Sequence, residues 1–409
     1  DVLRVDGPRG APAALIELQR SPALKNDLPR VIRPDLLLTD SGFSITELDS
    51  VPGGIGLTGW LNQTYTQLLT QTPNEPNPDS VAQDPTSSPS HSTRHPLDGE
   101  VKNTRFSGRK ESATSGIVGG SDAILRGFAG IFGDARNVHV IVSEESSTYY
   151  PEMAWLCQQL GPARFKVRDP RFMGFESGDA VYRFFELFDL ANVENSRLIF
   201  DRALEKRLRL TPPPKAIFEE KMLLALLWNR HLRGFWRQEL GEAFFRRLLE
   251  HVPYTWMVDP APLPPHGAIP ELNLTDWQQL KTLSQRERDL ILKVSGFSAH
   301  AWGARGVYLG SDLSVEEWSE AVDLALRHFD RSPCVLQRYH KPKIVESTWY
   351  DFEAGELRSM PGRVRLCPYY FVVGEGDAAR AQLGGILATI CPADKKIIHG
   401  MKEAILAPC

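Results

Sequence analysis

Residues 290–312 read LILKVSGFSAHAWGARGVYLGSD, and no other stretch of the chain is more informative. The segment begins as an apolar run that ends at Lys293, passes through a loop of small residues, and returns to an apolar run that ends at Gly310. This pattern predicts a β-hairpin. Because an unpaired ammonium group is expensive to bury at the end of an apolar strand, Lys293 needs an anion nearby.

The loop of this hairpin contains Gly296, Gly303 and Gly306, which allow the backbone to approach a ligand closely. A phosphate group is the anion that suits such a loop, with Arg305 as a second cation. The loop lacks the residue spacing of a P-loop. The alternative is an ordinary hairpin in which Lys293 extends to solvent and Arg305 is a surface charge.

The sequence after the hairpin predicts a helix at 314–330 and then a strand at 333–342, PCVLQRYHKP, which ends near Gln337 and Tyr339. Backbone groups at the end of such a strand can read the edge of adenine. This order of lysine-ended strand, glycine loop, helix and strand resembles the ATP-grasp superfamily, in which nucleotide lies between two α+β lobes. The nucleotide-binding residues that the resemblance implies are Lys293, Gly303, Arg305, Gly306, Gln337 and Tyr339.

A second motif, FSITELDSVPGGIG, occupies residues 43–56 after a predicted hairpin turn at 40–42. Alternation along the strand places Glu47 and Asp49 on one face, and two close carboxylates require a cation, an amine or hydrogen-bond donors. The motif is similar to one in the circularly permuted, glutathionylspermidine-synthetase-like branch of ATP-grasp proteins, with Asp49 where those proteins have Asn. The resemblance implies that both residues bind an amine-containing substrate. A solvated strand face is the alternative.

Three further cations are candidate site residues. The segment FEEKMLLALLWNR at 218–230 is similar to a helix that precedes the nucleotide lobes, so Lys221 is a candidate nucleotide ligand; a surface salt bridge is the alternative. Arg363 and Arg365 lie two residues apart on a predicted strand and therefore share a face. The strand resembles one whose arginine faces the transferred phosphoryl group, which implies a catalytic role, first for Arg365. A pair of exposed arginines is the alternative.

The ligands of a magnesium ion cannot be assigned from the sequence. Related proteins hold Mg²⁺ with acidic and amide side chains on late strands, because hard cations prefer oxygen ligands. The late strands here contain no such triplet. Asp351, Glu353 and Asp394 are the remaining acids, but DFEAGEL at 351–357 is more typical of a hairpin turn. Cys391 is expected to be a buried, inert thiol.

The pattern of elements predicts an α/β (α+β) fold, with an open α/β domain before a two-lobed ATP-grasp domain and a helical segment between them. Strand, helix and strand over residues 137–169 indicate a βαβ unit. Long amphipathic helices are predicted at 211–232 and 235–253, and another helix at 275–287. Strands are predicted at 363–373 and 384–390.

The predicted division of the chain has four parts. An N-terminal substrate domain would comprise 1–70 and 119–210, interrupted by a disordered insertion at 71–118 that is rich in Pro, Ser, Thr and Asn. The helical segment and first ATP-grasp lobe would occupy 211–310, and the second lobe 311–409.

Composition limits the functional classes. The chain has 409 residues, 42% of them apolar, and a formal charge of −4, which argues against a dedicated nucleic-acid binder. No apolar run is long enough to span a membrane, and the five widely spaced cysteines suggest a reducing compartment. We therefore expect a cytoplasmic protein without membrane or nucleic-acid partners. Because it begins with Asp1, we expect a fragment or a processed form.

Together these features predict an ATP-dependent carboxylate–amine ligase that acts through an acylphosphate, with ATP and Mg²⁺ as cofactors. Small carboxylates and amines would be its other partners, and a homo-oligomer is an open alternative to a monomer. Two functional alternatives remain: a nucleotide-binding module without ligase turnover, and a kinase-like phosphotransferase.

Overall fold

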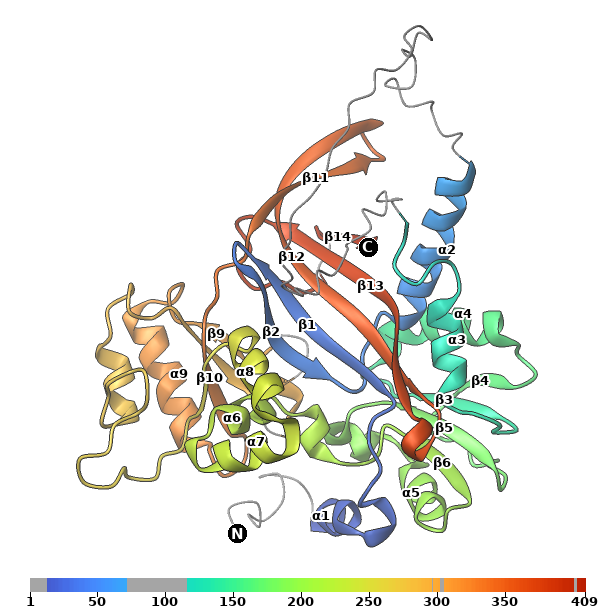
Figure 1. The fold of residues 1–409 in the computed structure, drawn as a ribbon, viewed down its shortest axis with the longest axis horizontal. Coiled ribbons are helices and arrows are strands. Elements are labelled where there is room, and N and C mark those ends of the chain that lie inside the picture. Colours follow the sequence, from blue (N-terminus) through green and yellow to red (C-terminus); the bar gives the residue numbers. More distant parts are fainter. Residues whose placement is uncertain (1–12, 72–115, 296, 302–304, 401–402) are drawn as a thin grey trace, which may run out of the picture.

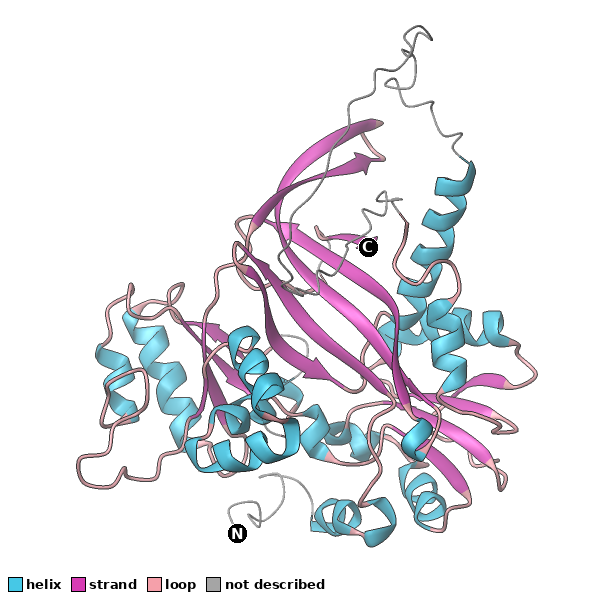
Figure 2. Cartoon of the chain, in the orientation of Figure 1, coloured by secondary structure: helices cyan, strands magenta, loops and turns pink. Residues whose placement is uncertain are grey.

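The computed structural model describes residues 13–71, 116–295, 297–301, 305–400 and 403–409. Within these ranges the strands form three sheets with helices between them, as the colouring in Figure 2 shows. The predicted α/β class is confirmed. A long antiparallel sheet crosses the middle of the molecule, and a smaller sheet lies on either side of it (Figure 1).

The central sheet has six strands in the order β14-β13-β12-β1-β2, with β11 paired to β12. Its strands are β1 (Val31–Thr39), β2 (Gly42–Asp49), β11 (Ile344–Asp351), β12 (Glu356–Val373), β13 (Arg380–Pro392) and β14 (Ile405–Pro408). The predicted hairpin around residues 40–42 is confirmed, because Thr39 lies opposite Gly42 in an antiparallel pair. The strands predicted at 363–373 and 384–390 are confirmed as parts of β12 and β13.

The second sheet is parallel, with the order β4-β3-β5-β6. Its strands are β3 (Val138–Val142), β4 (Phe165–Arg168), β5 (Asp179–Phe184) and β6 (Leu208–Thr211). Helix α4 (Tyr150–Leu160) connects β3 to β4, which confirms the predicted βαβ unit, and α5 (Ser196–Leu204) precedes β6. All five residues of β3 are buried, as expected for an inner parallel strand.

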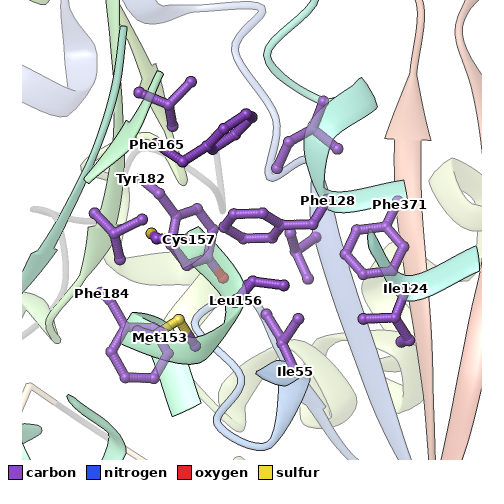
Figure 3. Packing of buried hydrophobic residues seen from close by; sticks show 14 of the residues in the cluster. Ile55, Ile124, Phe128, Met153, Leu156, Cys157, Phe165, Tyr182, Phe184 and Phe371 are labelled. Atoms are coloured by element: carbon purple, nitrogen blue, oxygen red, sulfur yellow. The ribbon is translucent and has the colours of Figure 1, made fainter. Parts of the chain in front are cut away.

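The main hydrophobic core joins the parallel sheet to the central sheet through α2 (Ile55–Gln71), α3 (Ala123–Gly130) and α4. Figure 3 shows Phe128 of α3 between Tyr182 of the parallel sheet and Phe371 of the central sheet. The rings of Phe128 and Tyr182 meet edge to face with centroids 5.0 Å apart. The two sheets therefore share one core.

The third sheet is antiparallel, with the order β7-β10-β8-β9. Its strands are β7 (Thr255–Met257), β8 (Leu290–Val294), β9 (Val307–Leu309) and β10 (Cys334–Arg338). Helix α9 (Val315–Arg327) begins at a capping box between Ser314 and Glu317 and buries Trp318 in the core of this sheet. The predicted hairpin, helix and strand between residues 290 and 342 are confirmed.

The long helices predicted after residue 211 are wrong. The first segment contains the short α6 (Met222–Trp228) between two 3-10 helices, Ala216–Glu219 and Arg230–Leu232. Extended backbone at Glu220 and Asn229 separates the three pieces. The second segment is divided into α7 (Arg233–Leu240) and α8 (Glu242–His251) at Gly241, whose φ of 76° does not belong to a helix. The helix predicted at 275–287 is a 3-10 helix at Trp277–Thr282.

Helix α1 (Ala13–Arg20) completes the α-helices of the described residues. Residues 72–115 of the predicted insertion lie outside the described residues. The division into domains stays a prediction, and strand pairing crosses two of its boundaries: the central sheet combines 31–49 with 344–408, and the third sheet combines 255–309 with 334–338. No helix in the described ranges is both long and apolar enough to cross a lipid bilayer.

Candidate functional site

A cavity of about 480 Å³ lies between the central sheet and the third sheet. Strands β1, β2 and β12 supply one wall, and β8, β9 and β10 supply the other. Eight of the site residues that the sequence predicts line this cavity: Glu47, Asp49, Lys221, Lys293, Arg305, Gln337, Tyr339 and Arg365. Packing thus brings together residues that are almost 320 positions apart in the sequence.

Lys293 occupies the buried strand β8 and extends its ammonium group into the cavity wall, where only 7% of the residue is exposed. Its Nζ donates hydrogen bonds to Gln337 Oε1 at 2.9 Å and to the carbonyl oxygen of Thr46 at 3.2 Å. Burial lowers the pKa of Lys293 to about 8, and the carboxylate of Glu47 opposes this shift. The group is therefore a cation near neutral pH that water stabilises poorly.

Glu47 and Lys221 form an ion pair inside the cavity, with 2.8 Å between Oε1 and Nζ. Lys221 also donates to the carbonyl oxygen of Ala301 at 2.7 Å, so it is held beside the loop that follows Lys293. Burial acts to raise the pKa of Glu47, but the ammonium groups of Lys221 and Lys293 outweigh it and the pKa lies below its usual value. Glu47 is thus an anion between two cations, with 35% of its side chain exposed.

Asp35 organises two arginines on the cavity wall that β1, β2 and β12 form. It is 1% exposed, and its carboxylate accepts hydrogen bonds from Arg33 Nε at 2.9 Å and Arg365 Nη1 at 3.0 Å. Burial would raise the pKa of Asp35, but Arg33 and Arg365 hold it below its usual value. Arg33 also pairs with Asp49 at 3.0 Å and donates to the carbonyl oxygen of Gly53 at 3.1 Å.

Sequence reasoning missed both Arg33 and Asp35. The signal was available, because the two residues lie two positions apart on β1 and face the predicted pair on β2: Arg33 is opposite Asp49, and Asp35 is opposite Glu47. Arg33 thus faces a carboxylate across the paired strands, whereas Asp35 and Glu47 are two carboxylates directly opposite each other. Arg365 adds a fifth charge, and its Nε has no hydrogen-bond partner among the described residues.

The predicted adenine-binding strand ends at the cavity, but the side chain of Gln337 is already engaged. Its Oε1 accepts from Lys293, and its Nε2 donates to Thr255 Oγ1 at 3.0 Å. The Tyr339 hydroxyl donates to the carbonyl oxygen of Lys396 at 3.4 Å, which joins β10 to the segment 396–400 at the cavity rim. Any adenine contact from Gln337 would therefore come from its backbone.

Arg305 lies at the cavity edge and pairs with Glu145 at 2.6 Å between Nη2 and Oε1. Gly306 does not line the cavity; its carbonyl oxygen accepts the Val294 amide at 2.9 Å and closes the hairpin. Gly303 lies outside the described residues. The predicted loop site is therefore represented in the described structure mainly by Arg305.

Arg363 is separated from Arg365 despite their expected shared face. Its Nε donates to the carbonyl oxygen of Ala393 at 2.8 Å, its Nη1 approaches that of Pro342 at 3.5 Å, and it does not line the cavity. Two residues of extended strand span about 6.6 Å, which is enough to carry Arg363 beyond the cavity end. Its predicted catalytic role stays a prediction, and its position favours a structural one.

The described residues contain no group of three or more side chains arranged to hold a metal ion. Three of the cavity carboxylates are instead paired with cations: Asp35 and Asp49 with Arg33, and Glu47 with Lys221. A fourth carboxyl group, that of Glu186, has its pKa raised well above the usual value by burial and by the neighbouring Glu219. Asp351 accepts the amides of the β11–β12 turn, which confirms the predicted hairpin, and Asp394 pairs with Lys395 at 3.5 Å. Nucleotide phosphates would find counter-charges here, whereas Mg²⁺ would not find an assembled ligand set.

No protein-family model matches the sequence, and neither does any curated protein. Among solved structures, the chain is similar to a glutathione synthetase-like effector from Globodera pallida, with a TM-score of 0.50 and 9% identity over 97% of this chain and 79% of that one. A putative gamma-glutamylcysteine synthetase from Methylobacillus flagellatus aligns with a TM-score of 0.45 and 12% identity over 97% and 84% of the two chains. The first likeness shows that this chain shares the fold of that glutathione synthetase-like protein.

Proposed function

We propose that the cavity binds ATP and that the protein is an ATP-dependent carboxylate–amine ligase. The observation that carries this proposal is the buried ammonium of Lys293 in the wall of a cavity that the cations Lys221 and Arg305 also line. A buried cation of this kind favours an anionic ligand, because the ligand replaces the solvation that burial removes. The shared fold with a glutathione synthetase-like protein supports the same class of reaction.

The nucleotide would lie between the two sheets that form the cavity walls. Its phosphates would meet Lys293, Lys221 and Arg305, and its base would lie along the backbone of Gln337 and Tyr339 at the end of β10. Backbone groups and apolar neighbours commonly orient a base in this way. The triphosphate would then extend towards β1 and β12.

Arg365 is the proposed catalytic residue. A carboxylate oxygen of the acid would attack the γ-phosphorus of ATP, ADP would leave, and an amine would then displace phosphate from the acylphosphate. Arg365 and Arg33 would stabilise the charge on the transferred group, since fixed cations in a buried site act strongly on developing charge. Asp35 would hold both guanidinium groups in position.

The amine would bind beside Asp49. Burial raises the pKa of Asp49, and Arg33 opposes this shift. A second cation would therefore relieve the burial of this carboxylate. Glu47, already paired with Lys221, would contribute less to amine binding.

Mg²⁺ would enter with ATP and would supply neutralisation of the phosphate charge. The described residues assemble no ligand set for it, so the proposed roles above rest on the side chains of this chain alone.

The test is release of ADP and phosphate that depends on both an added acid and an added amine. Lys293→Ala should abolish this release and the stabilisation of the protein by ATP. Lys395→Ala is the matched control, because Lys395 is a lysine outside the cavity lining. Release that survives in Lys293→Ala would refute the proposal.

The pairing of Asp35, Asp49 and Glu47 with internal cations favours one other function, a nucleotide-binding module without turnover. Stabilisation by ATP with no ADP release across a panel of acids and amines would select this second function. A phosphorylated product that is stable without any amine would instead identify a phosphotransferase.

A further inference from the structure

Strand β11 is an outer edge of the central sheet. Among the described residues it pairs only with β12, in an uninterrupted register from Ile344 opposite Arg363 to Asp351 opposite Glu356. The amide of Lys343 donates to the carbonyl oxygen of Leu38, so the free part of the edge begins at Ile344. Figure 1 shows β11 and the adjoining start of β12 extending beyond the other strands of the sheet.

This edge lacks the usual protection against pairing. Residues 344–350, IVESTWY, contain no proline and no bulge, and Glu346 is their single charged residue, so most of the features that normally block edge-to-edge contact are missing. The hairpin also exposes five large apolar side chains: Ile344, Trp349, Tyr350, Phe352 and Leu357. Phe352 is 89% exposed and Leu357 is 72% exposed, so the ribbon has apolar area available for a partner.

The hairpin tip has a defined shape. The Asp351 carboxylate accepts the amides of Glu353 at 2.9 Å and Ala354 at 3.0 Å, and it pairs with Arg358 at 3.1 Å. The rings of Tyr350 and Phe352 meet edge to face with centroids 5.1 Å apart. A partner would consequently meet an ordered strand, and association would require little further ordering.

We propose that β11 pairs with β11 of a second copy of this chain, antiparallel across a twofold axis at Ser347. A twofold axis perpendicular to an antiparallel pair places one residue opposite its own copy, and an axis at Ser347 pairs all seven residues 344–350. Val345 then lies opposite Trp349 of the second copy, and Ile344 lies opposite Tyr350. Such pairs of β-branched and aromatic residues stabilise neighbouring strands.

The sequence of β11 disfavours the neighbouring registers. An axis at Glu346 would place two carboxylates directly opposite each other, which is unfavourable. An axis at Thr348 would place Ile344 opposite Phe352, which lies in the turn beyond the strand. In the proposed register Glu346 faces Thr348, and no carboxylates oppose one another. The strand is therefore complementary to itself, which is the requirement for a symmetric dimer.

Light scattering coupled to size-exclusion chromatography tests the proposal on the full chain. The unmodified protein should have twice the mass of one chain, whereas Ser347→Lys and Ser347→Glu should each be monomeric because like charges meet at the axis. An equal mixture of the two variants should recover the dimer mass. Gln238→Lys, at an exposed position of α7, is the matched control and should remain dimeric. Circular dichroism would verify that each variant is folded.

A disulfide gives a second measurement. Ser347→Cys should form a covalent dimer under mild oxidation, while Thr348→Cys, which faces Glu346 of the second copy, should form much less. The unmodified chain, oxidised in the same way, controls for disulfides that form through the partly exposed Cys409. A monomer at every concentration, a dimer unaffected by Ser347→Lys, or equal cross-linking at the two positions would each overturn the proposed interface.

Discussion

Lys293 shows how a single residue acquires its chemistry from its surroundings. On the isolated strand it is a lysine among apolar residues, but in the fold it lies between a glutamine, a glutamate and a second lysine. Burial lowers its pKa to about 8, far below the usual value of about 10.4. Lys293 is therefore a cation near neutral pH that loses its proton at a lower pH than a solvated lysine does.

The affinity for ATP should depend on pH through Lys293. An anion in the cavity favours the ammonium form and raises its pKa, so binding above pH 8 requires uptake of a proton. Affinity should fall by up to about tenfold per pH unit above pH 8, and Lys293 should add no dependence well below pH 8. Titration calorimetry between pH 7 and pH 9.5 measures this. An affinity that is constant over that range would contradict the assignment of Lys293 as a phosphate ligand.

Asp35→Asn should destabilise the protein. The substitution removes the buried anion between Arg33 and Arg365, and breaking a buried ion pair from one side costs about 3 to 5 kcal/mol. Denaturation with urea would report the change in free energy of unfolding. Asp40→Asn, at an exposed position of the β1–β2 turn, is the control and should have little effect. Equal stabilities for the two variants would show that Asp35 does not organise the arginines.

At the scale of elements, the start of α2 depends on a side chain from another helix. Glu152 of α4 accepts the amides of Gly54 at 2.7 Å and Leu57 at 3.1 Å, which satisfies donors that the first turn of α2 leaves free. Burial raises the pKa of Glu152 to about 7, although these two hydrogen bonds oppose the shift. The joint between α2 and α4 is therefore sensitive to protonation.

This joint should make stability depend on pH. The pKa of Glu152 is higher in the folded chain than in the unfolded chain, so the folded state binds more protons between about pH 4.3 and pH 7. The stabilisation that Glu152 provides is fully present below that range and is lost as the pH rises through it. The free energy of unfolding should then fall by at most about 1.4 kcal/mol per pH unit. Glu152→Gln should flatten the slope in urea denaturation series. An unchanged slope would exclude Glu152 as its source.

At the scale of the whole molecule, the central sheet is the element that the other two sheets share. One face of the central sheet packs against α3 and the parallel sheet through Phe371. One end of the central sheet faces the third sheet across the cavity. Phe371 fits only because two glycines approach it. A Cβ at Gly127 would lie 2.3 Å from the ring, and one at Gly384 would lie 2.5 Å from it.

Gly127→Ala tests this contact. Alanine in a helix interior normally gains up to about 1 kcal/mol over glycine, but here its methyl group would collide with the fully buried ring of Phe371. Overpacking of a core costs about 1 to 3 kcal/mol, so the net effect should be a lower free energy of unfolding. Gly234→Ala, where a Cβ meets nothing within 4 Å, should be neutral or stabilising. Stabilisation of both variants would contradict the predicted close contact.

Several parts of the fold follow from local sequence. The apolar run before Lys293, the alternation of residues 43–48 and the capping residue Ser314 each predict an element that the structure contains. The failures are also local: Gly241 interrupts one segment whose apolar spacing is helical, and extended backbone at Glu220 and Asn229 interrupts the other. The spacing of apolar residues indicates which face a helix would bury, but it does not ensure that the backbone forms the helix.

The sequence by itself determined the strand that carries Lys293, the hairpin that carries Glu47 and Asp49, and the α/β class, since these depend on neighbours within a few residues. Only the tertiary structure decided that β1, β8, β10 and β12 surround one cavity, that Asp35 joins two arginines, and that Arg363 lies outside. The physical reason is range. Strand formation is local, whereas an ion pair between residues 330 positions apart exists only after the sheets have packed.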